Sequence, residues 1–163
     1  MATGQVTLAH ALMSTETPDP FSILDIRVYY EDTDTGGVVF YANYLKFFER
    51  GRTEWLRRLG VNQTELAQQE KRMFVVKQAE VQYRKPARLD DLIRVHSAIT
   101  RVSGASVDFL QSAYLDQDLL CESTIQICCV NTDTLRPSAI PPALRTLLEK
   151  VQTPSCKLPA NSR

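Results

Sequence analysis

The sequence has no excess of charge of either sign and no long apolar run. Its 163 residues include 19 Lys or Arg and 19 Asp or Glu, so the formal net charge at pH 7 is 0. Basic residues do not cluster with interleaved aromatics, which excludes the electrostatic footprint of a nucleic-acid-binding protein. The apolar runs are far shorter than the roughly 18 residues that a membrane-spanning helix needs. We therefore expect neither nucleic acid nor a membrane among the partners.

Cysteine and histidine are scarce, with four and two residues. No CxxC motif occurs, and both histidines lie far in sequence from the cysteines, which are Cys121, Cys128, Cys129 and Cys156. We therefore expect no metal, no other cofactor, and free thiols in a reducing compartment. The N-terminus lacks the basic segment of a signal peptide, which makes the cytoplasm the expected location. His96 lies in a strand-like stretch, either as an ordinary solvent-facing residue or as a general base with a cleft and a partner.

The length suits one domain with a single core. Residues 1–20 and 151–163 are rich in Ser, Thr and Pro and poor in periodicity, so we expect two flexible tails around a domain at 21–150. From Asn43 to Gly60 the apolar residues repeat at helical spacing, and a shorter helix is expected at 64–70. The first helix has a predicted core face of Leu45, Phe48, Gly51, Trp55, Leu56 and Leu59.

The remaining segments alternate apolar and polar residues with the period of a half-buried strand. In the second of these strands, Val75, Ala79, Val81 and Tyr83 are predicted to share one face. The connections are short, with Ser103 and Gly104 suited to a tight hairpin, and this favours an antiparallel meander. We predict an α+β fold in which the sheet covers the long helix, with strands at 21–30, 73–84, 91–102, 105–115 and 119–130.

The stretch EDTDTGG, residues 31–37, places two aspartates and two glycines between a strand and a helix. A calcium loop would need ligands at spacings that Gly36 and Asn43 do not supply. A purely structural turn explains one acid and one glycine, but not the apolar run that follows, which could form a pocket wall of Val38, Val39, Phe40 and Tyr41. A third interpretation is a catalytic carboxylate beside an anion-stabilising helix N-terminus, the two parts that acyl transfer needs. From the residues alone, the second and third interpretations both stand.

The stretch VYYEDTDTGGVVFYANYLKFFERGRTEWLRRLG resembles the signature of the hotdog-fold acyl-CoA thioesterases of the 4-hydroxybenzoyl-CoA thioesterase type. It is most similar to the Tol-Pal-associated branch, often called YbgC-type, which FVVKQAEVQYRKPARLDD also matches in type and order. The resemblance covers about residues 26–137 and implies a hotdog fold, with an antiparallel sheet wrapped around a long central helix. At Tyr41 this branch usually has histidine, whereas the 4-hydroxybenzoyl-CoA enzymes have tyrosine.

The resemblance implies that Asp34 acts as general base or nucleophile while the backbone N–H of Tyr41 polarises the thioester carbonyl. Asp32 is then a structural neighbour. The expected substrate-binding residues are Gly36, Gly37, Val38 and Asn43, and the expected coenzyme A-binding residues are Arg101, Ser103, Gly104 and Ser106. Because a sister branch uses an acid on the central helix, Glu49 is a competing carboxylate. A contact on the helix surface or between subunits is the preferred explanation of Glu49, since the acid of the loop already meets the geometric requirement.

The activity implied is hydrolysis of short-chain or aromatic acyl-CoA to the free acid and coenzyme A. Members of the family form dimers that join two sheets edge to edge, often paired into tetramers, with active sites between subunits. Acyl carrier protein is a further expected partner. The alternative is a weakly catalytic or non-catalytic scaffold that binds acyl groups or acyl carrier protein at the cell envelope.

Overall fold

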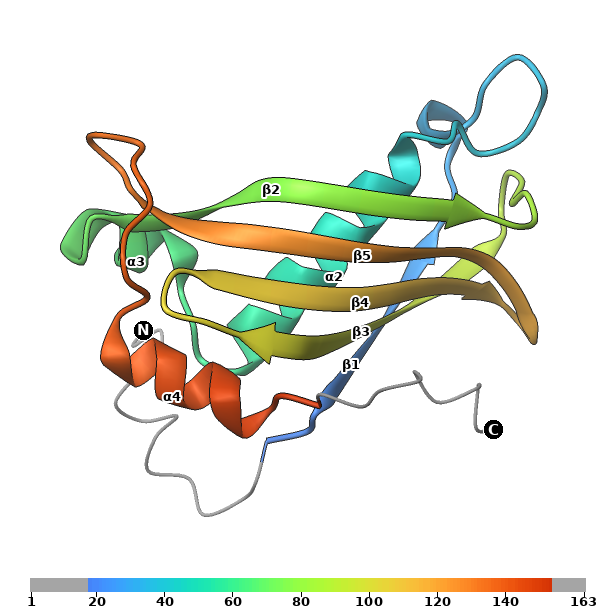
Figure 1. Ribbon diagram of the computed structural model, residues 1–163. Helices are drawn as coiled ribbons and strands as arrows, with labels where there is room; N and C mark the ends of the chain where they lie inside the picture. Colours follow the sequence, from blue (N-terminus) through green and yellow to red (C-terminus); the bar gives the residue numbers. More distant parts are fainter. Residues whose placement is uncertain (1–17, 154–163) are drawn as a thin grey trace, which may run out of the picture.

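One long helix lies against a five-stranded antiparallel sheet in the computed structural model, which describes residues 18–153 (Figure 1). The strand order is β1-β3-β4-β5-β2, and the predicted α+β architecture is confirmed. The predicted tails lie outside the described residues except for 18–20 and 151–153. The elements are β1 (Phe21–Arg27), the 3-10 turn η1 (Tyr30–Asp32), α2 (Asn43–Arg58), α3 (Gln63–Gln69), β2 (Arg72–Tyr83), β3 (Leu92–Val102), β4 (Ser106–Leu115), β5 (Asp118–Asn131) and α4 (Pro142–Lys150).

Helix α2 supplies the centre of the core and packs most closely on β3 and β1, then on β4. Gly51 allows this approach, because a Cβ there would lie 3.0 Å from Val95 Cγ1 and 3.1 Å from Ser97 Oγ. The buried face of α2 differs in part from the predicted one. Leu45 is 39% exposed, whereas Arg52, expected on the polar face, is only 7% exposed. The aromatic core residues that the prediction missed are Tyr44 and Phe47.

Strands β3, β4 and β5 follow the predicted alternation. Ile93, Val95 and Ile99 of β3 are buried, and they continue into an apolar layer formed by Val107, Phe109, Ala113, Cys121, Ile125, Ile127 and Cys129. Trp55 of α2 meets the edge of the Phe109 ring with the ring centroids 6.2 Å apart. Packing of this kind, rather than intrinsic propensity, provides most of the stability of a helix in a protein.

Strand β2 is an edge strand, paired only with β5 among the described strands. A bulge at Lys77 shifts the register between Val76 and Gln78, so that Val76 lies opposite the core residue Ile127 and Val75 opposite Cys128. The prediction that Val75 shares a face with Ala79 is therefore wrong, because one extra residue moves a side chain to the other face of the sheet. The inward-facing Val76 is nevertheless 55% exposed, so the inner face of β2 is uncovered there, although Phe74 and Val81 of β2 pack against the core.

Helix α4 closes the end of the core near the β3–β4 hairpin and was not predicted. Pro142 at its first turn begins the helix, and Leu144, Leu147 and Leu148 are buried at helical spacing. The signal was present in PPALRTLLEK but was too short to stand out from the tail that follows it. No helix within residues 18–153 has the length and apolar character needed to cross a membrane.

His96 lies on the face of β3 opposite to α2 and is only 2% exposed, so the expectation of a solvent-facing histidine is wrong. Its ring packs against Tyr114 with centroids 5.0 Å apart, and neither ring nitrogen has a hydrogen-bond partner among the described residues. Burial lowers the pKa of His96, and the neighbouring Arg94 lowers it further, against a smaller opposing effect of Asp25.

The buried His96 predicts a stability that falls in mild acid. Because its pKa is lower in the folded protein, the unfolded chain binds the proton more readily as the pH drops below about 6.5. The free energy of unfolding should be highest above that pH and fall as the pH approaches the folded-state pKa. Urea unfolding at pH 5.5 and 7.5 measures this difference. We expect His96→Gln to reduce it, and an unchanged difference in that variant would assign the pH dependence to other groups.

Candidate active site

Asp32, whose side chain is buried, holds the loop between β1 and α2 in place through hydrogen bonds. Its carboxylate accepts a hydrogen bond from the backbone N–H of Tyr29 at 2.9 Å. Its carbonyl oxygen accepts the N–H of Phe40 at 2.9 Å and the side-chain amide of Asn43 at 2.8 Å. Asp32 thus joins the end of β1 to the beginning of α2. Asn43, an expected substrate-binding residue, is buried beneath the loop, and its binding role stays a prediction.

Asp34 stands exposed at the base of a tight turn. Its backbone N–H donates to Val38 O at 2.9 Å, and Gly37 N–H donates back to Asp34 O at 3.0 Å. The Asp34 carboxylate accepts the N–H of Gly36 at 2.8 Å. Gly37 has φ of 74°, in the left-handed region, and a Cβ on Gly36 would lie 3.0 Å from Asp34 Oδ1. Both glycines therefore serve the turn that orients this carboxylate.

The start of α2 is open toward solvent. Ala42 at the N-cap offers no side-chain cap, and the first turn carries no acid to offset the positive end of the helix. Within residues 18–153 no hydrogen bond uses the backbone N–H of Tyr41, a residue that is 61% exposed. The hydroxyl of Tyr83 donates to the Tyr41 carbonyl at 2.9 Å, which fixes this helix start beside the end of the edge strand β2.

A cavity of about 280 Å³ opens next to this helix start. It contains Val39 and Tyr41 from the predicted apolar wall, but not Asp34, Gly36, Gly37 or Val38. The lining residues that the prediction missed are Tyr44, Tyr83, Arg84, Lys85 and Pro86. The lining residues at the end of β2 follow the loop by some forty residues in the sequence, so no local pattern could have connected them with it.

Three tyrosine rings pack edge to face around the cavity. The Tyr83 ring centroid lies 6.0 Å from that of Tyr41 and 5.8 Å from that of Tyr44. Burial raises the pKa of Tyr44 to about 12, with a further contribution from the nearby Cys121 thiol. Burial likewise raises the pKa of Tyr83. Both phenols therefore stay protonated at neutral pH, and the charged groups that line the cavity are Arg84 and Lys85, which pair with Glu122 and Asp118.

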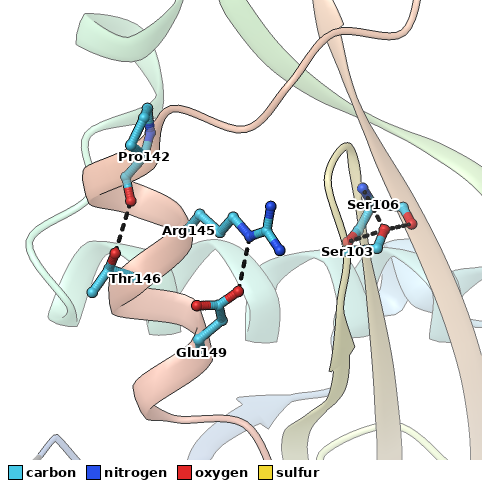
Figure 2. Close-up of polar contacts among 6 residues, drawn as sticks. All are labelled: Ser103, Ser106, Pro142, Arg145, Thr146 and Glu149. Carbon is cyan, nitrogen blue, oxygen red and sulfur yellow. Dashed lines mark hydrogen bonds and ion pairs between the residues drawn. The ribbon is translucent and has the colours of Figure 1, made fainter.

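The expected coenzyme A residues form the β3–β4 hairpin, where two serines bind each other (Figure 2). The Ser103 and Ser106 hydroxyls lie 2.7 Å apart, and Ser103 N–H donates to Ser106 O at 2.9 Å. Gly104 O accepts the N–H of Ile140 at 2.9 Å, which places the segment before α4 against the hairpin. On α4, Arg145 pairs with Glu149 at 2.8 Å. The guanidinium of Arg101 has no ion-pair partner among the described residues.

The hairpin and the Asp34 turn lie at opposite ends of the sheet (Figure 1). The turn follows β1, whose last residue Arg27 pairs with Leu92 at the start of β3, whereas the hairpin follows Val102 at its end. At about 3.3 Å per residue, that strand separates them by roughly 30 Å. One chain therefore does not bring the expected catalytic and coenzyme A residues together. No group of His, Cys, Asp and Glu side chains in the described part of the chain could hold a metal ion.

Comparison with known proteins decides the family. The model of the thioesterase-like superfamily matches residues 28–148. The chain belongs to the thioesterase-like superfamily. Its enzyme class is that of the thioester hydrolases, and the predicted hotdog fold is confirmed.

Relatives of this thioesterase match over most of their length. The acyl-CoA thioesterase YbgC of Haemophilus influenzae is 43% identical over 116 residues, which cover 71% of this chain and 85% of the relative. The acyl-CoA thioester hydrolase YbgC of Escherichia coli is 42% identical over 73% of this chain and 89% of its own. The crystal structure of a probable thioesterase from Bartonella henselae has a TM-score of 0.71 and 38% identity, covering 74% of this chain and 99% of that one. The predicted similarity to the YbgC branch is confirmed.

Proposed function

We propose that this thioester hydrolase cleaves acyl-CoA to the free acid and coenzyme A, with Asp34 as general base or nucleophile. The observation that carries the proposal is the pairing of an exposed, backbone-oriented carboxylate with a helix start whose Tyr41 N–H has no partner within residues 18–153. The family supplies the reaction class. The relatives at 42% and 43% identity are an acyl-CoA thioester hydrolase and an acyl-CoA thioesterase, which supports acyl-CoA as the substrate.

The chemistry would proceed in two steps. The thioester carbonyl oxygen accepts a hydrogen bond from the Tyr41 N–H, and the positive end of α2 stabilises the oxyanion as it develops. Asp34 either removes a proton from a water that attacks the acyl carbon or attacks that carbon itself. On the general-base route, the tetrahedral intermediate collapses, the carbon–sulfur bond breaks, and coenzyme A leaves as the thiol with the proton that Asp34 took from water. On the nucleophilic route, coenzyme A leaves as the thiolate and takes a proton from solvent, and water then hydrolyses the acyl-Asp34 anhydride to the free acid and the regenerated carboxylate. No other acid or base is assigned, because Tyr41 stands where the branch usually has histidine.

The acyl group is proposed to enter the cavity beside Tyr41. Its volume of about 280 Å³ and its aromatic lining suit a short aliphatic or an aromatic acyl group. Gly36, Gly37 and Val38 would contact the thioester from the side of the turn. Hydrolysis in the cytoplasm belongs to the same proposal, since that is where acyl-CoA is formed and used.

A second copy of the chain is proposed to complete the site. Among the described strands, none pairs with the outer edge of β2, and its inner face has exposed apolar side chains at Val76 and Tyr83. Two copies that pair antiparallel along β2 would reverse the direction of the sheet across the junction. The hairpin of one copy, with Arg101, Ser103, Gly104 and Ser106, could then bind coenzyme A whose thioester lies at the Asp34 turn of the other.

A panel of acyl-CoA substrates tests the proposal by following thiol release. We expect turnover well above the uncatalysed rate, and higher kcat/KM for short or aromatic acyl groups than for long ones. Tyr41→His, which restores the residue usual in the branch, should retain turnover, because the proposed role of this residue uses its backbone N–H. If no substrate turns over while acyl carrier protein binds tightly, the alternative of an envelope-linked binding scaffold is favoured.

A further inference from the structure

The backbone N–H of Tyr41 has a direction that the peptide groups around it fix. The carbonyl of Phe40 accepts the N–H of Asn43, the first residue of α2, at 2.9 Å. Phe40 C=O and Tyr41 N–H belong to one planar trans peptide group, in which the two bonds point in opposite directions. Because the Phe40 carbonyl points toward α2, the Tyr41 N–H points away from the helix.

The next peptide group, between Tyr41 and Ala42, is held by a side chain from a distant part of the sequence. The Tyr83 hydroxyl donates to the Tyr41 carbonyl oxygen at 2.9 Å, and within residues 18–153 no other hydrogen bond uses that oxygen. Ala42 offers no side-chain cap, and Tyr41 is itself 61% exposed. The Tyr83 hydroxyl is therefore the polar contact that ties this residue to the sheet.

Tyr83 is a rigid support for this bond, because it ends a paired strand. It is the last residue of β2 and pairs with Cys121 of β5. Its ring packs edge to face on that of Tyr44, a buried residue, with the centroids 5.8 Å apart. The end of β2 and the start of α2 lie at the same end of the sheet (Figure 1). The sheet thus sets the position of the hydroxyl, and the hydroxyl sets that of the Tyr41 carbonyl.

We infer that Tyr83 is a positioning residue for the hydrolysis, whose hydroxyl holds Tyr41 so that the backbone N–H is directed at the thioester oxygen before the substrate binds. The inference rests on the proposed function, in which this N–H polarises the thioester. A fixed donor stabilises the oxyanion without having to reorient during the reaction, and small displacements of such a group are costly. Burial raises the pKa of Tyr83, so the phenol keeps the proton that it donates.

Tyr83→Phe tests the inference, because it removes the hydroxyl and keeps the ring that lines the cavity. The residue is 47% exposed and its ring contacts are retained, so the variant should fold. We expect kcat for thiol release to fall about tenfold, with KM within about twofold of the wild type. The loss should be smaller than the roughly 100- to 1,000-fold that removal of an oxyanion donor costs, since the Tyr41 N–H is still present.

Tyr114→Phe is the matched control, the same change on β4. Tyr114 packs against His96 on the outer face of the sheet and does not line the cavity. Its kcat and KM should both stay within about twofold of the wild type.

The carbonyl stretching frequency of a bound thioester reports the hydrogen bond from Tyr41 directly. Benzoyl-CoA labelled with ¹³C at the thioester carbonyl is bound to the Asp34→Asn variant, in which turnover is slow. Infrared difference spectra should show the stretch below that of the free ligand, because a hydrogen bond weakens the C=O bond. Adding Tyr83→Phe to this variant should return the frequency part of the way to the free value. A loss of fold stability alone would not move this band.

Wild-type kcat in Tyr83→Phe would overturn the inference and leave the proposed function standing, whether or not KM rises, since the hydroxyl would then at most bind the acyl group. Reduced kcat with an unchanged carbonyl frequency would overturn it as well, because the hydroxyl would then act by a route other than the Tyr41 N–H. A wild type that releases no thiol from any acyl-CoA would overturn the proposed function and the inference with it.

Discussion

Asp34→Asn is expected to lower thiol release from acyl-CoA by about 100- to 10,000-fold, the range that a general base contributes. The amide cannot take a proton or attack the acyl carbon. Its oxygen can still accept the N–H of Gly36, the bond that measures 2.8 Å to Asp34 Oδ1, so the turn should keep its shape. Unchanged KM with reduced kcat would show that the loss lies in chemistry rather than in binding.

Glu31→Gln is the control for this experiment, because it removes an exposed acid from the same loop. We expect its kcat/KM to stay within about twofold of wild type. Full activity in Asp34→Asn would remove Asp34 from the mechanism. If Asp34→Asn loses activity as expected, a single turnover of the wild type in ¹⁸O-water separates the two proposed roles. A general base sends the label directly into the product acid. Hydrolysis of an acyl-aspartate intermediate at the aspartyl carbonyl leaves the label on the enzyme.

Val76→Lys is expected to yield a folded monomer with thiol release reduced by roughly 100-fold. The side chain points to the inner face of β2 but is 55% exposed, so a lysine should cost a single chain little. In the proposed assembly the same lysine would be buried in each copy. A cost of about 2.7 kcal/mol for the interface raises the dissociation constant of the assembly about 100-fold, and thiol release falls as the assembled fraction falls. Sedimentation measures the assembly, and thiol release measured at equal chain concentration gives the activity.

Val75→Lys is the matched control, since Val75 precedes Val76 on the same strand and points to the outer face. This variant should assemble and turn over like the wild type. If Val76→Lys remains dimeric and active, the β2 edge does not join the copies. If it becomes monomeric but remains active, the site needs no second copy, and the proposed coenzyme A role of the hairpin is wrong, because one chain holds the hairpin roughly 30 Å from Asp34.

The elements with strong periodicity were predictable, and those that depend on register were not. The helix from Asn43 and the strands β3 to β5 could be read from apolar spacing, because one side of each is buried within its own chain. In β2 the bulge at Lys77 changed the face of Val75, and nothing in MFVVKQAEVQYR distinguishes a bulge from a regular strand. Leu45 and Arg52 were misplaced for a similar reason. Periodicity identifies a stripe, but not which part of it the sheet covers.

The fold class and the turn around Asp34 could be predicted from the amino-acid sequence, because hydrophobic period and local turn chemistry act over a few residues. The family could be recognised from the resemblance of residues 28–60 to a known signature. Only the tertiary structure showed that Tyr44 and Tyr83 meet Tyr41 at one cavity, and that the β3–β4 hairpin lies at the far end of the sheet from Asp34. It also placed the guanidinium of Arg52 against β4, where it donates to Gln111 Oε1. These contacts and separations involve residues far apart in the chain. They depend on strand order and helix orientation, which are set by the packing of the whole core.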